Sequence, residues 1–199
     1  YLRGQDLMVR YYRREANTHA RRLFEESAKL DPSYGRPYAG LSRTFNLAWR
    51  YRWTEEPVAS LERATVLARR AIDQDDLDGR AFAELGYACL YQKRHVEAMA
   101  AYERAIELNP NDADVLAEMS DALTCIAEPN RAVELMRRAM RLNPWYPDWY
   151  LWNYAEALFD LGQYTDVVAT LAKMRDPTEG HRLLAASYAL LGQLDMARQ

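Results

Sequence analysis

Apolar residues along this chain recur at i, i+3, i+4 and i+7, the spacing that places side chains on one face of an α-helix. Tyr38, Leu41 and Phe45 follow this spacing, and the full pattern recurs far along the chain at Leu151, Tyr154, Ala155 and Leu158. Short turns rich in Asp, Asn, Pro and Gly separate the amphipathic segments, and the sequence has no useful run of alternating apolar and polar residues. We therefore expect an all-α fold without a sheet.

The helical pattern itself repeats every 34 residues. Leu108-Asn109-Pro110 and Leu142-Asn143-Pro144 lie 34 residues apart, and Leu30-Asp31-Pro32 lies two such periods and ten residues before the first. A period of this length predicts stacked helical hairpins that form a solenoid. Two consecutive units carry apolar or small residues at matching positions: Phe82, Leu85, Gly86, Ala98, Tyr102 and Ala105, then Leu116, Met119, Ser120, Ala132, Met136 and Ala139.

The period divides the chain into six units, at residues 1–34, 35–78, 79–112, 113–146, 148–177 and 178–199. The ten extra residues fall in the second unit around Trp49–Pro57, with Pro57 in the first turn of the next helix and Thr54 as its cap. The fifth unit ends early at Pro177, which predicts a short second helix, and the sixth is truncated. We expect a single array of about five and a half helical hairpins over residues 1–199.

This frame resembles the tetratricopeptide repeat family across nearly the whole chain. The resemblance implies a right-handed superhelix of paired antiparallel helices, which offers a binding surface for a protein or peptide and needs no cofactor. In chaperone adaptors of this family, a clamp of Lys and Asn residues grips the two carboxylates of a peptide C-terminus. The corresponding positions here hold Gln5, Val9 and Gly40, so the resemblance does not carry that activity over.

Three stretches support a narrower resemblance: Tyr1–Gly4, Trp49–Ala64 and Leu142–Asn153. Together they look like the C-terminal repeat region of bacterial class III adenylate or guanylate cyclases, and similar regions also follow the winged-helix DNA-binding domains of bacterial regulators. The resemblance implies a regulatory or assembly module for an enzyme elsewhere in the parent chain. Two alternatives stay open: a partner- or ligand-sensing domain of a winged-helix transcription regulator, and a small-ligand sensor with a pocket among aromatic residues.

Composition and charge narrow the choice of partners. Hydrophobic residues make up 49% and charged residues 28% of the chain, with a net charge of -3, so the chain as a whole attracts neither nucleic acid nor an anionic membrane. No apolar segment reaches the ~18 residues of a membrane span. We expect a protein or peptide partner, no nucleic acid and no membrane insertion. One basic run offers contacts to phosphates, although an exposed helix face is the favoured interpretation: Arg10, Arg13, Arg14, Arg21 and Arg22.

Residues that catalyse reactions or bind metals are not gathered in the sequence. The three histidines are scattered, and no Gly-rich phosphate loop or nucleophile motif occurs. The acidic run Asp73–Gly79 lacks the glycine that a calcium loop needs at its sixth position, so an inter-repeat turn is the favoured interpretation. Cys89 and Cys125 are expected to be buried free thiols, which favours a cytoplasmic location. We predict no metal site, no cofactor and no catalytic activity.

The two ends of the sequence give two further expectations. The chain begins at Tyr1 without Met and ends at Gln199 within an expected helix, which suggests a fragment of a longer protein. The truncated sixth unit would leave Leu184, Tyr188 and Leu191 without a covering helix. Because terminal repeats need a polar outer face for solubility, we expect self-association through this end.

In a solenoid of this kind, the first helix of each hairpin lines the inner, concave wall. The wall changes from basic to acidic to aromatic along its length, which suits an extended peptide or a helix of mixed charge with an apolar anchor. The alternative for the two tryptophans is packing between the fourth and fifth units. The frame assigns the binding groove to Arg36, Arg43, Asn46, Arg80, Tyr87, Asp114, Glu118, Asp121, Trp149 and Trp152. Ala39, Ala83, Leu90, Ala117 and Glu156 fall on the same wall.

Overall fold

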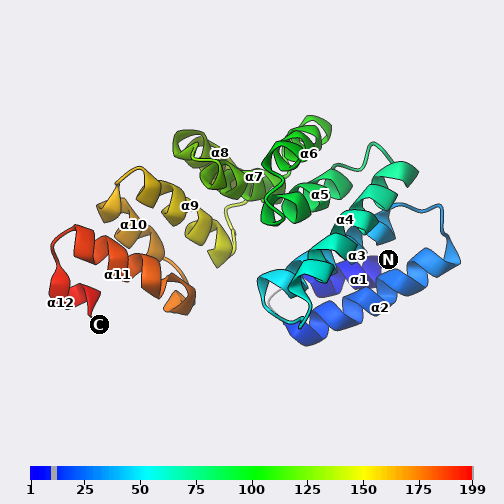
Figure 1. Cartoon of the computed structure of the whole chain (residues 1–199), viewed down its shortest axis with the longest axis horizontal. Coiled ribbons are helices and arrows are strands. Elements are labelled where there is room, and N and C mark those ends of the chain that lie inside the picture. Colours follow the sequence, from blue (N-terminus) through cyan, green and yellow to red (C-terminus); the bar gives the residue numbers. More distant parts are fainter. Residues whose placement is uncertain (10–12, 199) are drawn as a thin grey trace. The chain divides into compact units, whose positions relative to one another are not determined.

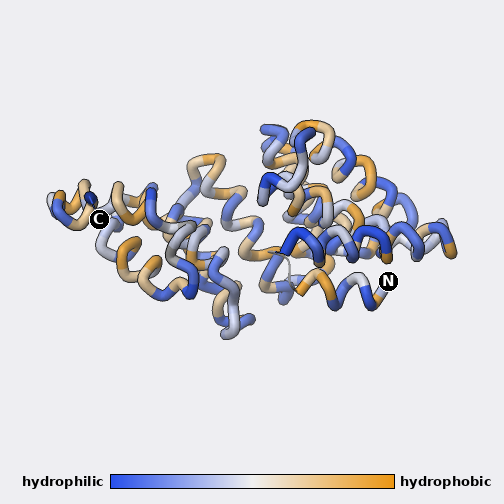
Figure 2. The backbone as a smooth tube through the Cα atoms, turned by 90° about the horizontal axis from the view of Figure 1, so that it is seen from below, coloured by the Kyte–Doolittle hydropathy of each residue, from blue (hydrophilic) through white to orange (hydrophobic). Residues whose placement is uncertain are grey.

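The computed structural model describes residues 1–9 and 13–198, and all of its regular structure is helical (Figure 1). Within these residues there is no strand, as the hydrophobic pattern predicts. Arg10 of the predicted basic run lies outside the described residues. Hydrophobic and hydrophilic positions are interspersed along the helices (Figure 2), as in helices that bury one face. None of the described helices is both long and apolar enough to cross a membrane.

The chain divides into two compact units, Tyr1–Pro110 and Asn111–Gln199. In each unit, consecutive helices pack in pairs, as a helix–turn–helix repeat requires. The first unit contains α1 (Leu2–Met8), α2 (Arg14–Leu30), α3 (Arg36–Arg50), α4 (Pro57–Gln74), α5 (Gly79–Tyr91) and α6 (His95–Leu108). The second contains α7 (Ala113–Cys125), α8 (Pro129–Leu142), α9 (Asp148–Asp160), α10 (Tyr164–Leu171), the 3₁₀ turn η1 (Pro177–Gly180), α11 (His181–Leu190) and α12 (Leu194–Ala197). The expectation of one continuous array over both units stays a prediction.

The turn inside the second to sixth hairpins has one recurring form. At the ends of α3, α5, α7, α9 and α11 a residue with positive φ follows the helix: Arg52, Lys93, Ala127, Gly162 and Gly192. After α5, for example, Lys93 N donates to Leu90 O at 2.9 Å and Arg94 N donates to Cys89 O at 2.9 Å. Such a pair of bonds satisfies carbonyls that would otherwise be unpaired at the helix end.

The turns between hairpins depend on short polar side chains. Asp75 Oδ1 accepts a bond from Leu77 N at 3.1 Å, and Asp78 Oδ1 accepts one from Arg80 N at 3.0 Å at the start of α5. Asp112 caps α7 in a similar way, by accepting a bond from Val115 N at 3.2 Å. The acidic run Asp73–Gly79 therefore forms a turn and a helix cap, as expected from its favoured interpretation.

The insertion of the second hairpin is spread over three elements, whereas the sequence placed it around Trp49–Pro57. α3 is 15 residues long and α4 is 18, against 13 for α5 and 14 for α6. Pro57 occupies the first turn of α4, as predicted, but the prediction of Thr54 as its cap is wrong. Thr54 lies two residues before Glu56, the N-cap residue, and its Oγ1 accepts a bond from Glu56 N at 3.1 Å, which orders the loop instead.

Small residues let the paired helices approach closely. A Cβ atom on Gly86 would lie 2.9 Å from the ring of Tyr102, and one on Gly40 would lie 2.8 Å from the ring of Phe24. Both rings are fully buried. The predicted core residues Leu85, Tyr102, Leu116 and Met136 are all buried, with exposures of 8%, 0%, 0% and 0%. The predicted short second helix of the fifth hairpin is also confirmed, because α10 has 8 residues where α8 has 14.

Candidate protein-binding surfaces

First helices of consecutive hairpins lie against one another within each unit. α3 contacts α5 in the first unit, and α7 contacts α9 in the second. Side chains beside the contact between these helices therefore lie on one surface in each unit. We call these the α3–α5 surface and the α7–α9 surface, and all of the predicted groove residues come from these four helices.

A buried carboxylate organises the α3–α5 surface. Glu84 has an exposure of 3%, and its Oε2 accepts a hydrogen bond from Asn46 Nδ2 at 2.8 Å. Asn46 Nδ2 also donates to the Glu84 backbone oxygen at 3.1 Å, and Arg43 Nη1 lies 4.0 Å from Glu84 Oε1. A buried carboxylate without such partners would be strongly destabilising. Arg43 and Asn46, both predicted as groove residues, thus join α3 to α5 through Glu84.

Three aromatic side chains, Trp49, Tyr87 and Tyr91, form a cluster beside this carboxylate. The ring centroids of Trp49 and Tyr91 lie 4.3 Å apart, and that of Tyr87 lies 6.4 Å from Trp49 and 4.7 Å from Tyr91. Tyr87 is buried, while Trp49 and Tyr91 are partly exposed. The aromatic cluster therefore presents an apolar, partly accessible patch on the α3–α5 surface.

The sequence pattern identified only Tyr87 in this cluster. Trp49 was assigned to the insertion, but α3 continues to Arg50, so its side chain stays on the helix face that meets α5. The sequence does not show where α3 ends. The turn after α3 has Arg52 at its positive-φ position, so no glycine marks this turn. The other predicted residues of this surface differ in access. Arg36 is exposed at the start of α3, Arg80 is partly exposed, and Ala39, Ala83 and Leu90 are buried rather than accessible.

A buried tyrosine organises the α7–α9 surface. Tyr150 on α9 has an exposure of 0%, and its hydroxyl donates to Asp114 Oδ1 on α7 at 2.7 Å. Burial, and then the charge of Asp114, raise the pKa of Tyr150 above its ordinary value, so the hydroxyl stays a donor. Asn153 Nδ2 makes a longer bond to Ala117 O, at 3.5 Å. Asp114 is thus a structural partner as well as a predicted groove residue.

Two predicted anchors, Trp149 and Trp152, lie three residues apart on α9 and so face the same side of the helix. Both are partly exposed, and Trp149 meets the edge of Tyr150 with ring centroids 4.4 Å apart. Their indole rings are thus partly packed against the rest of the unit and partly accessible to a binding partner. Among the acidic residues, Asp121 is buried with an exposure of 8%, whereas Glu118 and Glu156 are partly exposed. Ala117 is fully buried, so it is not an accessible wall residue.

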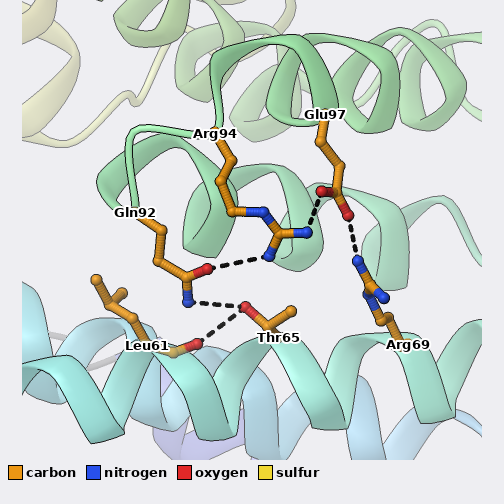
Figure 3. Close-up of polar contacts among 6 residues, drawn as sticks. All are labelled: Leu61, Thr65, Arg69, Gln92, Arg94 and Glu97. Carbon is orange, nitrogen blue, oxygen red and sulfur yellow. Dashed lines mark hydrogen bonds and ion pairs between the residues drawn. The ribbon is translucent and has the colours of Figure 1, made fainter.

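A separate polar network joins the second helices of the first unit (Figure 3). Thr65 on α4 accepts a bond from Gln92 Nε2 at 3.0 Å, and Gln92 Oε1 accepts one from Arg94 Nη1 at 3.1 Å. Glu97 on α6 pairs with both Arg94 and Arg69, and Arg69 belongs to α4. Burial opposes the ionisation of Glu97, but the bond from Arg69 and the two guanidinium charges outweigh it, so the pKa of Glu97 is lowered. The network fixes α4 against α6.

Neither cysteine forms a disulfide. Cys89 is buried, and this burial raises the pKa of its thiol to about 11, so the thiol is protonated and unreactive at neutral pH. Cys125 is exposed, so the expectation that both thiols are buried is wrong for it. It is the last residue of α7. Among the described residues, no three His, Cys, Asp or Glu side chains are placed to hold a metal ion.

Hairpins of this size, stacked through their first helices, define a helical-repeat scaffold. Residues 79–112 match a family model described as "Tetratricopeptide repeat", and residues 127–191 match a second model with the same description. Residues 79–112 and 127–191 of the chain thus carry tetratricopeptide repeats. This fold generally serves as a binding scaffold and not as a catalyst. A comparison with curated proteins gave no match.

Solved structures with the same repeat resemble this chain in fold. A thermophilic TPR protein of Thermus thermophilus is 17% identical with a TM-score of 0.70, and the match covers 94% of this chain and 98% of that one. PilF of Pseudomonas aeruginosa is 19% identical with a TM-score of 0.67, covering 98% and 86%. YrrB, described as "a TPR protein with an unusual peptide-binding site", is 19% identical with a TM-score of 0.57, covering 87% and 86%. At these identities the likeness concerns the fold alone.

Proposed function

We propose that the chain is a protein-interaction module that binds an extended peptide or a partner helix along its first helices. The observation that carries this proposal is the pairing of partly exposed aromatic rings with charged side chains on the α3–α5 and α7–α9 surfaces. Aromatic residues dominate the binding energy of many interfaces, and charged residues at the rim set orientation. The peptide-binding site described for YrrB supports the same use of the fold.

The α3–α5 surface offers Trp49 and Tyr91 as apolar contacts and Arg36 as an exposed cation. The α7–α9 surface offers Trp149 and Trp152 beside Glu118 and Glu156. A ligand of mixed charge with aromatic or aliphatic anchors is complementary to both. Asn46, Tyr87 and Asp121 are buried, so in this proposal they hold the surfaces in shape and the exposed neighbours touch the ligand.

Panning a displayed peptide library against the immobilised chain tests the proposal directly. Enriched peptides should combine apolar anchors with charged residues, and their binding should weaken on Trp49→Ala or Trp152→Ala. Arg36→Glu should have a smaller effect that fades as salt is added, because exposed charges act over the Debye length. The absence of any enriched peptide, or peptides that bind all three variants as they bind the parent, would refute the proposal.

Within this function, we propose that the chain regulates or assembles a bacterial adenylate or guanylate cyclase. The support is the resemblance of Tyr1–Gly4, Trp49–Ala64 and Leu142–Asn153 to the repeat region of those enzymes. The alternative is the sensing domain of a winged-helix transcription regulator. The coding sequence upstream of Tyr1 separates the two, because one context encodes a cyclase domain there and the other a DNA-binding domain. Two free cysteines support a cytoplasmic location for either.

Self-association through α11 and α12 is part of the proposal. Leu190, Leu194 and Met196 are 56%, 55% and 45% exposed there, while Leu184, Tyr188 and Leu191 are partly covered. A pair of such faces would bury apolar surface on both copies. Sedimentation equilibrium should therefore show reversible dimers that dissociate on Leu194→Asp. A chain that stays monomeric at high concentration would exclude this mode of assembly.

A further inference from the structure

The first unit contains a pocket of about 430 Å³ away from the α3–α5 surface. It lies between α2, the second half of α3, the loop that follows α3 and the start of α4. The longer loop of the inserted hairpin supplies Trp53, Thr54, Glu55 and Glu56 to its lining. A water molecule needs roughly 30 Å³, so the pocket has room for a small organic molecule.

Arginine side chains from two helices meet in this pocket. Arg21 donates from Nε to Thr44 Oγ1 at 2.9 Å and from Nη2 to Thr44 O at 3.0 Å, which uses two of its five N–H groups. Its guanidinium carbon lies 3.9 Å from the ring centroid of Phe45, and that of Arg63 lies 5.9 Å from the same centroid. Phe45 therefore holds two cations in place through its π face. Arg14, at the start of α2, adds an exposed third cation.

Acidic and amide groups complete the lining. Glu56 Oε2 lies 3.6 Å from Arg63 Nη2, and Glu55 is exposed. Three guanidinium groups thus face two carboxylates, which leaves an excess of positive charge. Asn17 has an exposure of 3%, and its Nδ2 donates to Thr44 O at 3.1 Å. Its Oδ1 is buried and has no hydrogen-bond partner among the described residues.

Guanidinium groups bind carboxylates and phosphates through two parallel N–H···O bonds. With three arginines against two carboxylates, the lining therefore favours a small molecule that carries an oxyanion.

We propose that this pocket binds a small organic oxyanion, a carboxylate or a phosphate ester. Arg14 and Arg21 contact the oxyanion, and Arg63 is held by Glu56 to complete the positive wall. The site does not overlap the α3–α5 surface, so the bound molecule and a peptide partner occupy different places. The inserted hairpin thereby gives this repeat protein a small-molecule site of its own.

Isothermal titration at low salt with four amino acids tests the proposal. L-aspartate presents a carboxylate and O-phospho-L-serine a phosphate on the same small body, while L-asparagine is the neutral counterpart of L-aspartate and L-lysine is a cation. At least one of the two anions should bind with a millimolar or tighter Kd. It should bind at least about ten-fold tighter than L-asparagine, and L-lysine should not bind. Tighter binding of one of the two anions shows whether the pocket prefers a carboxylate or a phosphate.

Arg14→Gln and Arg22→Gln form a matched pair of variants. Both arginines are exposed residues of α2, but only Arg14 lines the pocket. Arg14→Gln should raise the Kd for the anion at least about ten-fold, and Arg22→Gln should leave this Kd unchanged. Circular dichroism checks that both variants fold. Failure of both anions to bind the parent chain, or equal affinity in the two variants, would overturn the proposal.

Discussion

Ala127, Lys93 and Arg52 adopt positive φ values of 60°, 63° and 54° in turns where the fifth and sixth hairpins carry Gly162 and Gly192. The left-handed region costs a residue with a Cβ atom roughly 1–2 kcal/mol relative to glycine. These positions are therefore strained in the same way, and the turn is kept because its two hydrogen bonds satisfy the helix end. The sequence could not show this, since only the two glycines mark the turn.

Replacing Ala127 with glycine should raise the free energy of unfolding by about 0.5–1 kcal/mol, because release of the backbone strain outweighs the added freedom of the unfolded chain. Ala169→Gly is the control, since Ala169 is also exposed but lies inside α10. That change should destabilise by about 0.5–1 kcal/mol. Urea unfolding of both variants gives the comparison. Destabilisation of equal size in the two would show that Ala127 is not strained.

The buried apolar face of the helices gives a second prediction about single residues. Leu85 is 8% exposed, whereas Leu30 in the same unit is 88% exposed. Leu85→Ala should lower the free energy of unfolding by about 2–5 kcal/mol through lost burial and a residual cavity, and Leu30→Ala should change it by less than about 0.5 kcal/mol. Equal losses in chemical denaturation would mean that the helical frame is misplaced.

At the scale of elements, helix positions followed from the sequence more closely than contacts between helices did. The 34-residue period placed the hairpins, because each helix needs its own apolar stripe. The burial of Asn46 and Asp121 could not be predicted, since the frame assigns a residue to a helix face but does not show how near the next helix lies. The aromatic cluster was missed for a related reason, as the length of α3 depends on where its turn forms.

The network of Figure 3 gives a pH-dependent prediction for the contact between α4 and α6. The pKa of Glu97 is lowered from its ordinary value of 4.5, so its ion pairs stabilise the folded state above that pH and lose this effect as pH falls through the folded pKa. Glu97→Gln should cost under about 1 kcal/mol at pH 7, as for other exposed pairs. The difference from the parent should shrink below about pH 4.

Glu103→Gln is the control for this experiment, because Glu103 is an exposed residue of the same helix. Its effect on the free energy of unfolding should be near zero at pH 7. Denaturant titrations at several pH values measure both variants. A Glu97→Gln effect that is equally large at pH 7 and at pH 3 would show that packing, and not the charge of Glu97, holds the two helices together.

At the scale of the whole molecule, the all-helical repeat fold could be predicted, and the division into two compact units could not. Repeat periodicity describes each hairpin alike and gives no sign of where one compact unit ends and the next begins. The same limit applies to binding. The repeat period identifies Trp149 and Trp152 as residues of first helices. The ten-residue insertion appears in the sequence only as a longer spacing between repeats, which does not show that it forms a pocket with Arg14 and Arg21.

In the proposed function, partly exposed aromatic residues on the first helices bind the protein partner, and Trp152→Ala removes one of them. Trp145, which is 86% exposed in the loop before α9, provides the matched control variant Trp145→Ala. The measurement is the Kd for the tightest peptide or partner captured by the chain, together with the melting temperature of each variant. We predict that Trp152→Ala weakens binding at least ~30-fold with little change in melting temperature, while Trp145→Ala binds as the parent does. A lower melting temperature for Trp152→Ala with unchanged affinity of the folded fraction would show that Trp152 supports the fold and does not bind the partner.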